Sequence, residues 1–240
     1  MQSLQDFQKQ IGIEFSDITL LERAFTHRSY LNEHPKLGLE HNERLEFLGD
    51  AVLEIVVTDF LYRNYPNPEG DLTNWRSALV KTESLADVAQ ALELNRFFKL
   101  SRGEAKGNSR SHGLISANAV EAVIGAIYLD QGYDAASRFI SDNIISKLTH
   151  ILEIGSWVDP KSKFQEESQD RFGLTPNYRV TSEEGPDHDK IFTVGVYVGD
   201  RLYGKGQGSS KQAAQQVAAA VALKTFARDA ASEKADQLGA

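Results

Sequence analysis

The chain has 240 residues, a formal net charge of −8, and hydrophobic residues at 41% of its positions. This length accommodates one large domain or two small domains with proper cores. The absence of cysteine excludes disulfides, thiolate metal sites and cysteine nucleophiles. We expect a cytoplasmic protein without a membrane partner, because no signal peptide is apparent and no apolar run approaches the roughly 20 residues that span a bilayer.

The negative charge is unevenly distributed along the chain. Residues 160–228 contain ten Lys and Arg against eight Asp and Glu, a balance of +2. The remainder of the chain therefore carries a balance of −10. An acidic region can gather cations, whereas a balance of +2 is modest for a part of a protein that binds nucleic acid.

Residues 1–150 have the pattern of an all-α domain. Ser16-Asp17 is a helix start signal before an apolar run, and apolar residues recur at helical spacing from Leu45 to Phe60. The segment Pro66–Asp71 interrupts this pattern. Two further amphipathic stretches cover 79–94 and 117–129, and the Gly-, Ser- and Arg-rich segment 101–113 between them predicts a basic loop.

The pattern changes to a small α+β module after a boundary at Asp159-Pro160, where proline disfavours helical geometry in the residue before it. A helix is predicted over 161–172, followed by three strands and an alanine-rich helix that Ser209 or Ser210 caps. In the strands, Tyr178 and Val180 are expected on the same face as Thr193. We thus predict a multidomain chain: an all-α domain (1–150), a linker (151–159), an α-β-β-β-α domain (160–228) and a flexible tail (229–240).

Three acidic residues share one face of a predicted helix. Glu43, Glu46 and Asp50 follow one another at i, i+3 and i+7. Like charges at this spacing destabilise a helix unless a cation neutralises them, and Mg²⁺ prefers oxygen ligands. The alternative is a solvated acidic face, but neighbours such as Leu45 and Leu48 favour a mostly buried helix.

A fourth acidic residue, Glu121, lies in an apolar helix rich in small residues that should pack closely against a neighbour. A buried carboxylate there needs a partner or a metal ion. Asn118 precedes it by about one turn and offers a carbonyl oxygen from the same face. The alternative is a Glu121 side chain that points outward from a half-buried helix.

Seven separated segments together resemble bacterial ribonuclease III over nearly the whole chain. They occur in the order of that family, in which the first four belong to the nuclease domain and the last three to the double-stranded RNA-binding domain. These segments are Thr26–Tyr30, Asn42–Ala51, Glu69–Leu72, Gly125–Asp130, Asp159–Lys161, Gly185–His188 and Gly206–Lys211.

The resemblance implies a role for each acidic residue. Glu46, Asp50, Asn118 and Glu121 would be metal ligands for Mg²⁺, with Mn²⁺ as a substitute.

In the same family pattern, Asp50 and Glu121 would be catalytic. Glu43 and Glu69 would be accessory acidic residues that help to place RNA. Phe47 would contact the second subunit of a homodimer, although an ordinary core position remains the alternative for this residue.

The resemblance also implies an RNA-binding surface in the second domain. Such a domain spans about 16 base pairs through contacts to the backbone and minor grooves of an A-form duplex. The family pattern is weakened at Gln212 and Ala213, where basic residues are common, so fewer phosphate contacts and lower affinity are expected. The residues expected to bind RNA are Gln165, Glu166, Gln169, His188, Ser210 and Lys211.

The expected function is Mg²⁺-dependent cleavage of double-stranded RNA to 5′-phosphate and 3′-hydroxyl ends, in the processing of ribosomal and messenger RNA precursors, without a small-molecule cofactor. The family usually has Asp where this chain has Asn118, and the loss of one negative charge should weaken Mg²⁺ binding. A protein that binds double-stranded RNA with impaired cleavage is therefore the alternative. A small-molecule metal hydrolase would leave residues 160–228 without a purpose.

Overall fold

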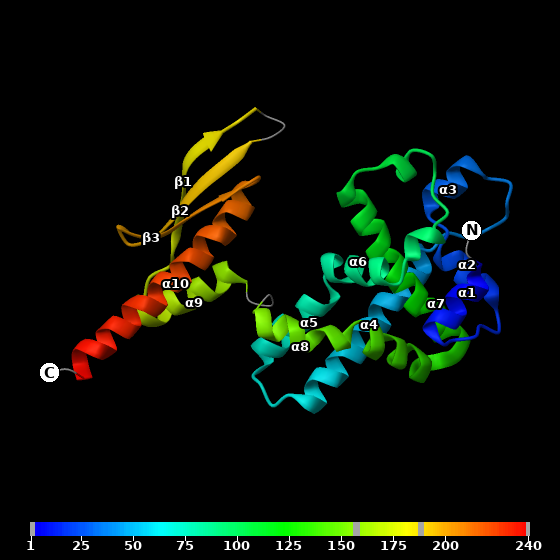
Figure 1. Ribbon diagram of the computed structural model, residues 1–240, viewed down its shortest axis with the longest axis horizontal. Coiled ribbons are helices and arrows are strands. Elements are labelled where there is room, and N and C mark those ends of the chain that lie inside the picture. Colours follow the sequence, from blue (N-terminus) through cyan, green and yellow to red (C-terminus); the bar gives the residue numbers. More distant parts are fainter. Residues whose placement is uncertain (1–2, 156–158, 187–189, 239–240) are drawn as a thin grey trace. The chain divides into compact units, whose positions relative to one another are not determined.

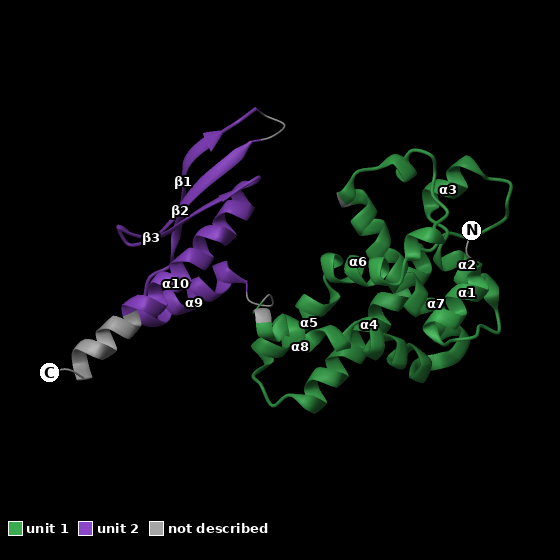
Figure 2. Cartoon of the chain, viewed as in Figure 1, with its two compact units in different colours: residues 1–157 green, residues 158–240 purple. Residues whose placement is uncertain are grey.

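The computed structural model describes residues 3–155, 159–186 and 190–238. The chain divides into two compact units, residues 1–157 and 158–240 (Figure 2). The first unit is helical and the second combines helices with a sheet (Figure 1). The predicted fold class, an all-α domain followed by a small α-β-β-β-α domain, is thus confirmed.

The first unit is built around two long helices, α4 (Glu43–Asn64) and α7 (Ser109–Asn143), which pack along one another. The predicted interruption after α4 is confirmed, because the chain leaves the helix at Tyr65 and re-enters one at Glu69. The other helices of this unit are α1 (Leu4–Ile11), α2 (Ile18–Ala24), α3 (Arg28–Glu33), α5 (Glu69–Val80), α6 (Thr82–Ala91), α8 (Leu148–Ile154), and the short 3-10 helices η1 (Leu94–Arg96), η2 (Glu104–Lys106) and η3 (Ile145–Lys147).

The segment expected to be a loop, 101–113, is partly helical. It contains η2, and α7 begins within it at Ser109. The Asn108 side chain accepts a hydrogen bond from the Ser111 backbone N–H at 2.9 Å and so caps the helix. An asparagine cap thus starts the helix about eight residues before the apolar stretch that the sequence pattern marked.

Helix α7 forms the centre of the first core. Val120, Val123, Ile124 and Ile127 on this helix are fully buried. Within the described residues, the stretch Ser111–Glu153 is the one helical segment long and apolar enough to cross a membrane by length and composition, contrary to the expectation that no apolar run is long enough. Half of its apolar window is buried inside the unit, as is usual for the core helix of a globular domain.

Two glycines allow the backbones of α4 and α7 to touch. A Cβ atom at Gly49 would lie 1.7 Å from the carbonyl oxygen of Glu121, and one at Gly125 would lie 2.3 Å from the carbonyl oxygen of Leu45. No side chain larger than hydrogen fits at either position unless the helices separate. This close approach brings the acidic first half of α4 against the part of α7 that carries Glu121.

The second unit is a three-stranded antiparallel sheet in the order β1 (Asn177–Glu184), β2 (Ile191–Val198), β3 (Arg201–Gly208). Helix α10 (Lys211–Leu238) packs against β2 and β3, and helix α9 (Pro160–Phe172) packs against α10. Between helices and sheet lies a second core, which comprises Phe164, Val196, Val198, Tyr203, Ala218, Ala219, Ala222 and Phe226.

Three details differ from expectation, two in the second unit and one at the end of the first unit. Tyr178 pairs with Val196 in the sheet register and packs on the core, so it lies on the helix-covered face and not beside Thr193. Helix α8 continues to Ile154, beyond the expected domain end at 150. Helix α10 continues to Leu238, where we expected a flexible tail from 229, because alanine, glutamate and lysine in that segment favour helix.

Replacement of Gly49 by alanine tests the contact between α4 and α7. We expect Gly49→Ala to lower the free energy of unfolding by about 3 kcal/mol, because the new methyl group overlaps a backbone carbonyl. Gly113→Ala is the matched control on α7, where the added Cβ meets nothing within 4 Å; it should stabilise the helix by about 0.5–1 kcal/mol. Urea unfolding measures both, and equal effects would contradict the packing.

Candidate active site

The contact between α4 and α7 gathers acidic and amide side chains from two distant segments. Glu46 and Asp50 lie on α4, and Asn118 and Glu121 lie on α7. Asp50 and Glu46 raise the pKa of the Glu121 carboxyl, whereas Asp50 raises and Asn118 lowers the pKa of the Glu46 carboxyl. The four residues predicted to be metal ligands are therefore close enough in the fold to influence one another.

Glu121 is the most strongly perturbed of these groups. Burial, and after it the negative charges of Asp50 and Glu46, together raise the pKa of its carboxyl to about 7. The side chain is half-buried between neighbours that offer it no compensating positive charge. A pKa near neutrality means that the cluster holds a proton that a bound cation would displace.

Glu46 is perturbed by the same two effects but is partly relieved by an amide. Burial raises the pKa of its carboxyl, and the charges of Glu43 and Asp50 add to that effect. The Asn118 side chain opposes it, because its amide donates a hydrogen bond to the Glu46 carboxylate. Asn118 therefore acts as a hydrogen-bond donor to the cluster here, whereas an aspartate would add another repelling charge.

The donor set fits a hard divalent cation in its chemistry. Three carboxylates and one amide oxygen are the ligand types that Mg²⁺ and Mn²⁺ prefer, and a cation would remove the repulsion that raises the pKa of Glu121. In the part of the chain that the structure describes, no three His, Cys, Asp or Glu side chains lie together closely enough to hold an ion. Binding would thus require the carboxylates to turn towards a common point.

Glu43 lies on the exposed edge of the cluster and is already partnered. Its two carboxylate oxygens lie 3.6 Å from Arg28 Nη1 and 3.7 Å from His41 Nδ1. These two basic partners come from α3 and from the segment before α4. Sequence spacing gave no sign of them, since an ion pair of residues from different elements is visible only in the fold.

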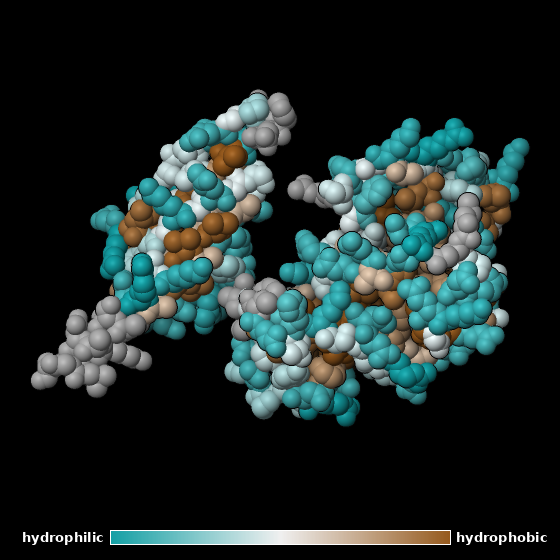
Figure 3. Space-filling model, viewed as in Figure 1, coloured by the Kyte–Doolittle hydropathy of each residue, from teal (hydrophilic) through white to brown (hydrophobic). Residues whose placement is uncertain are grey.

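Phe47 projects from the same turn of α4 into solvent. Its side chain is 80% exposed, so the alternative of an ordinary core position is wrong. Ile55 and Tyr62 are also exposed and follow it along α4 at intervals of eight and seven residues, which keeps them near one side of the helix. Figure 3 shows that brown, hydrophobic patches interrupt a largely hydrophilic surface.

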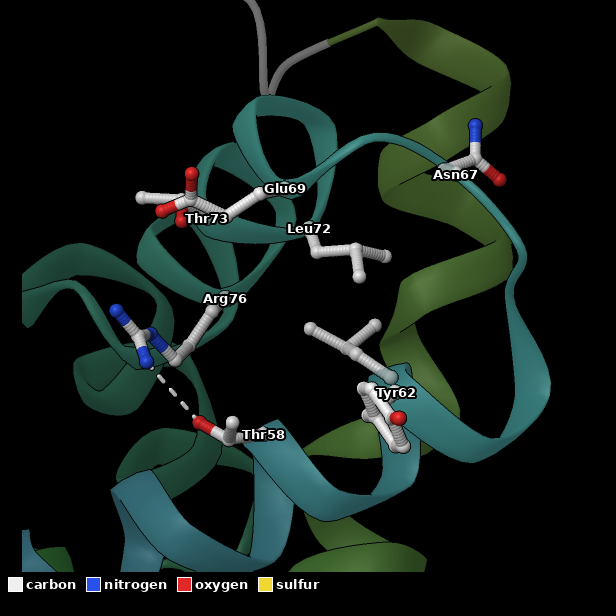
Figure 4. A pocket seen from close by; sticks show the side chains of 8 residues that line it. Thr58, Tyr62, Asn67, Glu69, Leu72, Thr73 and Arg76 are labelled. Atoms are coloured by element: carbon white, nitrogen blue, oxygen red, sulfur yellow. Dashed lines mark hydrogen bonds between the residues drawn. The ribbon is translucent and has the colours of Figure 1, made fainter.

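Glu69 lies apart from the coupled carboxylates. It is the first residue of α5 and lines a cavity of about 410 Å³ together with Tyr62, Leu72 and Arg76 (Figure 4). In this cavity, Arg76 Nη1 donates a hydrogen bond to Thr58 Oγ1 at 3.1 Å. Glu69 is not among the groups that perturb the pKa of Glu46 or Glu121, so the structure of one chain does not join it to the cluster.

The residues of the second unit that were expected to bind RNA fall in two places. Gln165, Glu166 and Gln169 line one open, polar hollow on α9. Ser210 and Lys211 lie at the start of α10, where the Ser210 hydroxyl accepts a hydrogen bond from the Ala213 N–H at 3.1 Å and caps the helix. His188 lies outside the described residues.

The raised pKa of Glu121 predicts a specific dependence of stability on pH. A carboxyl whose pKa rises from the ordinary 4.5 to about 7 on folding retains its proton only in the folded state, so stability falls as pH rises through this window. Glu121→Gln removes this loss. In EDTA, the variant should gain about 1–2 kcal/mol over the native protein between pH 5 and pH 8, allowing for solvent screening.

Denaturant unfolding of both proteins at the two pH values measures this gain. Glu69→Gln is the matched control, since that carboxyl is exposed and outside the cluster. A gain that is the same for both variants would contradict the coupling of Glu121 to its neighbours.

Comparison with known protein families assigns both units. Residues 17–148 match the Ribonuclease-III-like family, and residues 160–225 match the double-stranded RNA binding motif. The first match covers the helices that carry the acidic cluster, and the second covers the α-β-β-β-α unit.

Individual relatives agree with this assignment. Ribonuclease 3 of Carboxydothermus hydrogenoformans is 46% identical over 227 residues, which cover 92% of this chain and 95% of the relative. Ribonuclease 3 of Latilactobacillus sakei is 43% identical over 92% of this chain and 96% of its own.

A solved structure resembles the first unit. The nuclease domain of ribonuclease III from Campylobacter jejuni, with structural flexibility in a region involved in dimer formation, is 38% identical. It aligns with a TM-score of 0.53 over 59% of this chain and 98% of its own. Together with the matches of both units, these relatives show that the chain belongs to the ribonuclease III family and is an endoribonuclease with a double-stranded RNA binding motif.

Proposed function

We propose that this endoribonuclease cleaves double-stranded RNA with the help of Mg²⁺, which Mn²⁺ can replace, and leaves 5′-phosphate and 3′-hydroxyl ends. The observation that carries the proposal is the raised pKa of Glu121 within a set of neighbouring acidic side chains. Such a set is unfavourable in the metal-free protein and becomes favourable when a divalent cation binds. No nucleophilic side chain is required, because water serves as the nucleophile.

In this proposal Glu46, Asp50, Asn118 and Glu121 hold the cation, with Asp50 and Glu121 as the residues on which catalysis depends most. The cation supplies charge stabilisation at the phosphate and lowers the pKa of water. Glu121 must release its proton to serve as a ligand, which the charge of the cation promotes. Asn118 must turn its amide so that the oxygen faces the ion, since its N–H group donates to Glu46 in the metal-free form.

The second unit binds the duplex in this proposal. The polar face of α9 with Gln165, Glu166 and Gln169 meets a minor groove, and Lys211 at the start of α10 meets phosphate. Ser210 contributes by capping α10, which directs the free N–H groups of the first turn towards an anion. His188, which lies between β1 and β2 in the sequence, is proposed to reach a second minor groove.

We further propose that the enzyme acts as a homodimer in the cytoplasm, in the processing of ribosomal and messenger RNA precursors. The exposed Phe47 supports the dimer, because a large aromatic side chain in solvent gains stability when a partner covers it. The Campylobacter jejuni nuclease domain is described with a region involved in dimer formation, which also supports this assignment. Glu43 and Glu69 would help to position RNA in the assembled dimer.

Cleavage of a long labelled RNA duplex tests the function. We expect discrete products with Mg²⁺ and none with EDTA. In Asn118→Asp, the Mg²⁺ concentration for the half-maximal rate should fall roughly tenfold, because a charged ligand replaces a neutral one. Glu14→Gln, which removes an exposed carboxyl outside the cluster, should leave that Mg²⁺ concentration unchanged.

Binding of the duplex without cleavage by the native chain, together with cleavage by Asn118→Asp, would contradict the proposal. That outcome would establish the alternative, an RNA-binding form of the nuclease fold in which an amide at position 118 impairs cleavage.

Replacement of Phe47 tests the dimer. We expect Phe47→Ala to raise the dissociation constant of the dimer at least about tenfold, since loss of a well-buried aromatic at an interface typically removes more than 1–2 kcal/mol. Sedimentation equilibrium measures the change. Leu129→Ala removes a 53% exposed residue of α7 and serves as the control. A native protein that stays monomeric at micromolar concentration would contradict the dimer itself.

A further inference from the structure

The first turn of α10 presents a single charged side chain to an incoming phosphate. Its residues are Lys211, Gln212, Ala213 and Ala214, of which only the lysine is charged. The helix N-terminus adds partial positive charge from free N–H groups, but a full charge comes from Lys211 alone. A group that pairs with the Lys211 ammonium in the free protein therefore has a strong influence on phosphate binding at this end of the helix.

The structure shows Lys211 held by two residues of the sheet. Its Nζ lies 3.2 Å from Glu183 Oε1 and 5.5 Å from the centre of the Phe192 ring. Glu183 and Phe192 are direct partners across β1 and β2, so they approach the lysine from adjacent strands. The carboxylate is an anion that already lies where an RNA phosphate would approach the ammonium group.

The second oxygen of the same carboxylate faces another lysine. Glu183 Oε2 lies 3.8 Å from Lys190 Nζ, so Glu183 bridges two positive charges. If Lys211 turns to a phosphate, Glu183 retains an attractive partner in Lys190. The side chains of Lys211 and Glu183 are 57% and 38% exposed, and an exposed pair of this kind is weak enough for a phosphate to displace.

We propose that Glu183 is an internal competitor for Lys211, and that double-stranded RNA binds this surface by displacing the carboxylate. The inference rests on the proposed phosphate contact of Lys211. Glu183 lowers the affinity for any duplex. It also requires that an RNA phosphate lie at the first turn of α10, where it can replace the carboxylate. It thus limits binding to anions that the rest of the RNA-binding surface also holds in place.

Duplex affinity in EDTA, where cleavage is prevented, tests the proposal on the full-length chain. The probe is a labelled RNA duplex of about 20 base pairs, which exceeds the roughly 16 that such a domain spans. We expect Glu183→Gln to tighten binding by about two- to five-fold, the range that corresponds to loss of one exposed ion pair. Glu184→Gln is the matched control, because it removes the same charge from the next residue on the opposite side of β1.

Lys211→Gln and the double variant Glu183→Gln/Lys211→Gln separate this inference from the proposed function. We expect Lys211→Gln to weaken binding, and Glu183→Gln to have no more effect than Glu184→Gln once Lys211 is absent. If Lys211→Gln binds as well as the native chain, the proposed phosphate contact is wrong. Suppose instead that Lys211→Gln weakens binding. The competitor role is then wrong if Glu183→Gln and Glu184→Gln raise the affinity of the native chain equally. It is also wrong if Glu183→Gln still raises the affinity more than Glu184→Gln does when Lys211 is absent. Circular dichroism melting of each variant confirms that the second unit remains folded.

Discussion

The contact of α4 with α7 at Gly49 and Gly125 determines the rest of the first unit. Backbone carbonyls occupy the space where a side chain would lie at either glycine, so the backbones of the two helices lie directly against one another. This approach places Glu46 and Asp50 beside Asn118 and Glu121, which lie some 70 residues away along the chain. The apolar residues on the inner faces of both helices stabilise the contact and are among the most fully buried in the molecule.

The same contact places carboxylates close enough to repel one another in the folded protein. Burial and neighbouring charge raise the pKa of Glu121 to about 7, and the hydrogen bond from Asn118 relieves only Glu46. Strongly perturbed carboxyls cluster at functional sites because the arrangement that destabilises the free protein favours the bound state. In the second unit the charges are arranged oppositely: Glu183 satisfies Lys211 in the free protein, and RNA must displace it. Metal binding thus relieves repulsion, whereas RNA binding replaces an existing attraction.

The sequence predicted the element types and the order of the two domains, because helical and alternating periodicity are local properties. It also identified the residues of the acidic cluster through their resemblance to a family motif, while their catalytic roles stay predictions. It did not predict the pairing of Glu43 with Arg28 and His41 or of Glu183 with Lys211, since residues of separate elements meet only in the folded chain. The sequence also placed the start of α7 too late, because the Asn108 cap begins the helix before the apolar pattern does.

Titration of the metal-free protein with Mn²⁺ at pH 6 and pH 8 tests the central claim most directly, with bound metal followed by the loss of the electron paramagnetic resonance signal of free Mn²⁺. If cation binding requires Glu121 to release a proton with a pKa of about 7, the affinity should be roughly tenfold lower at pH 6 than at pH 8. Glu121→Gln should bind weakly at both pH values. Equal affinity at the two pH values, or pH-dependent binding that survives in Glu121→Gln, would contradict the account.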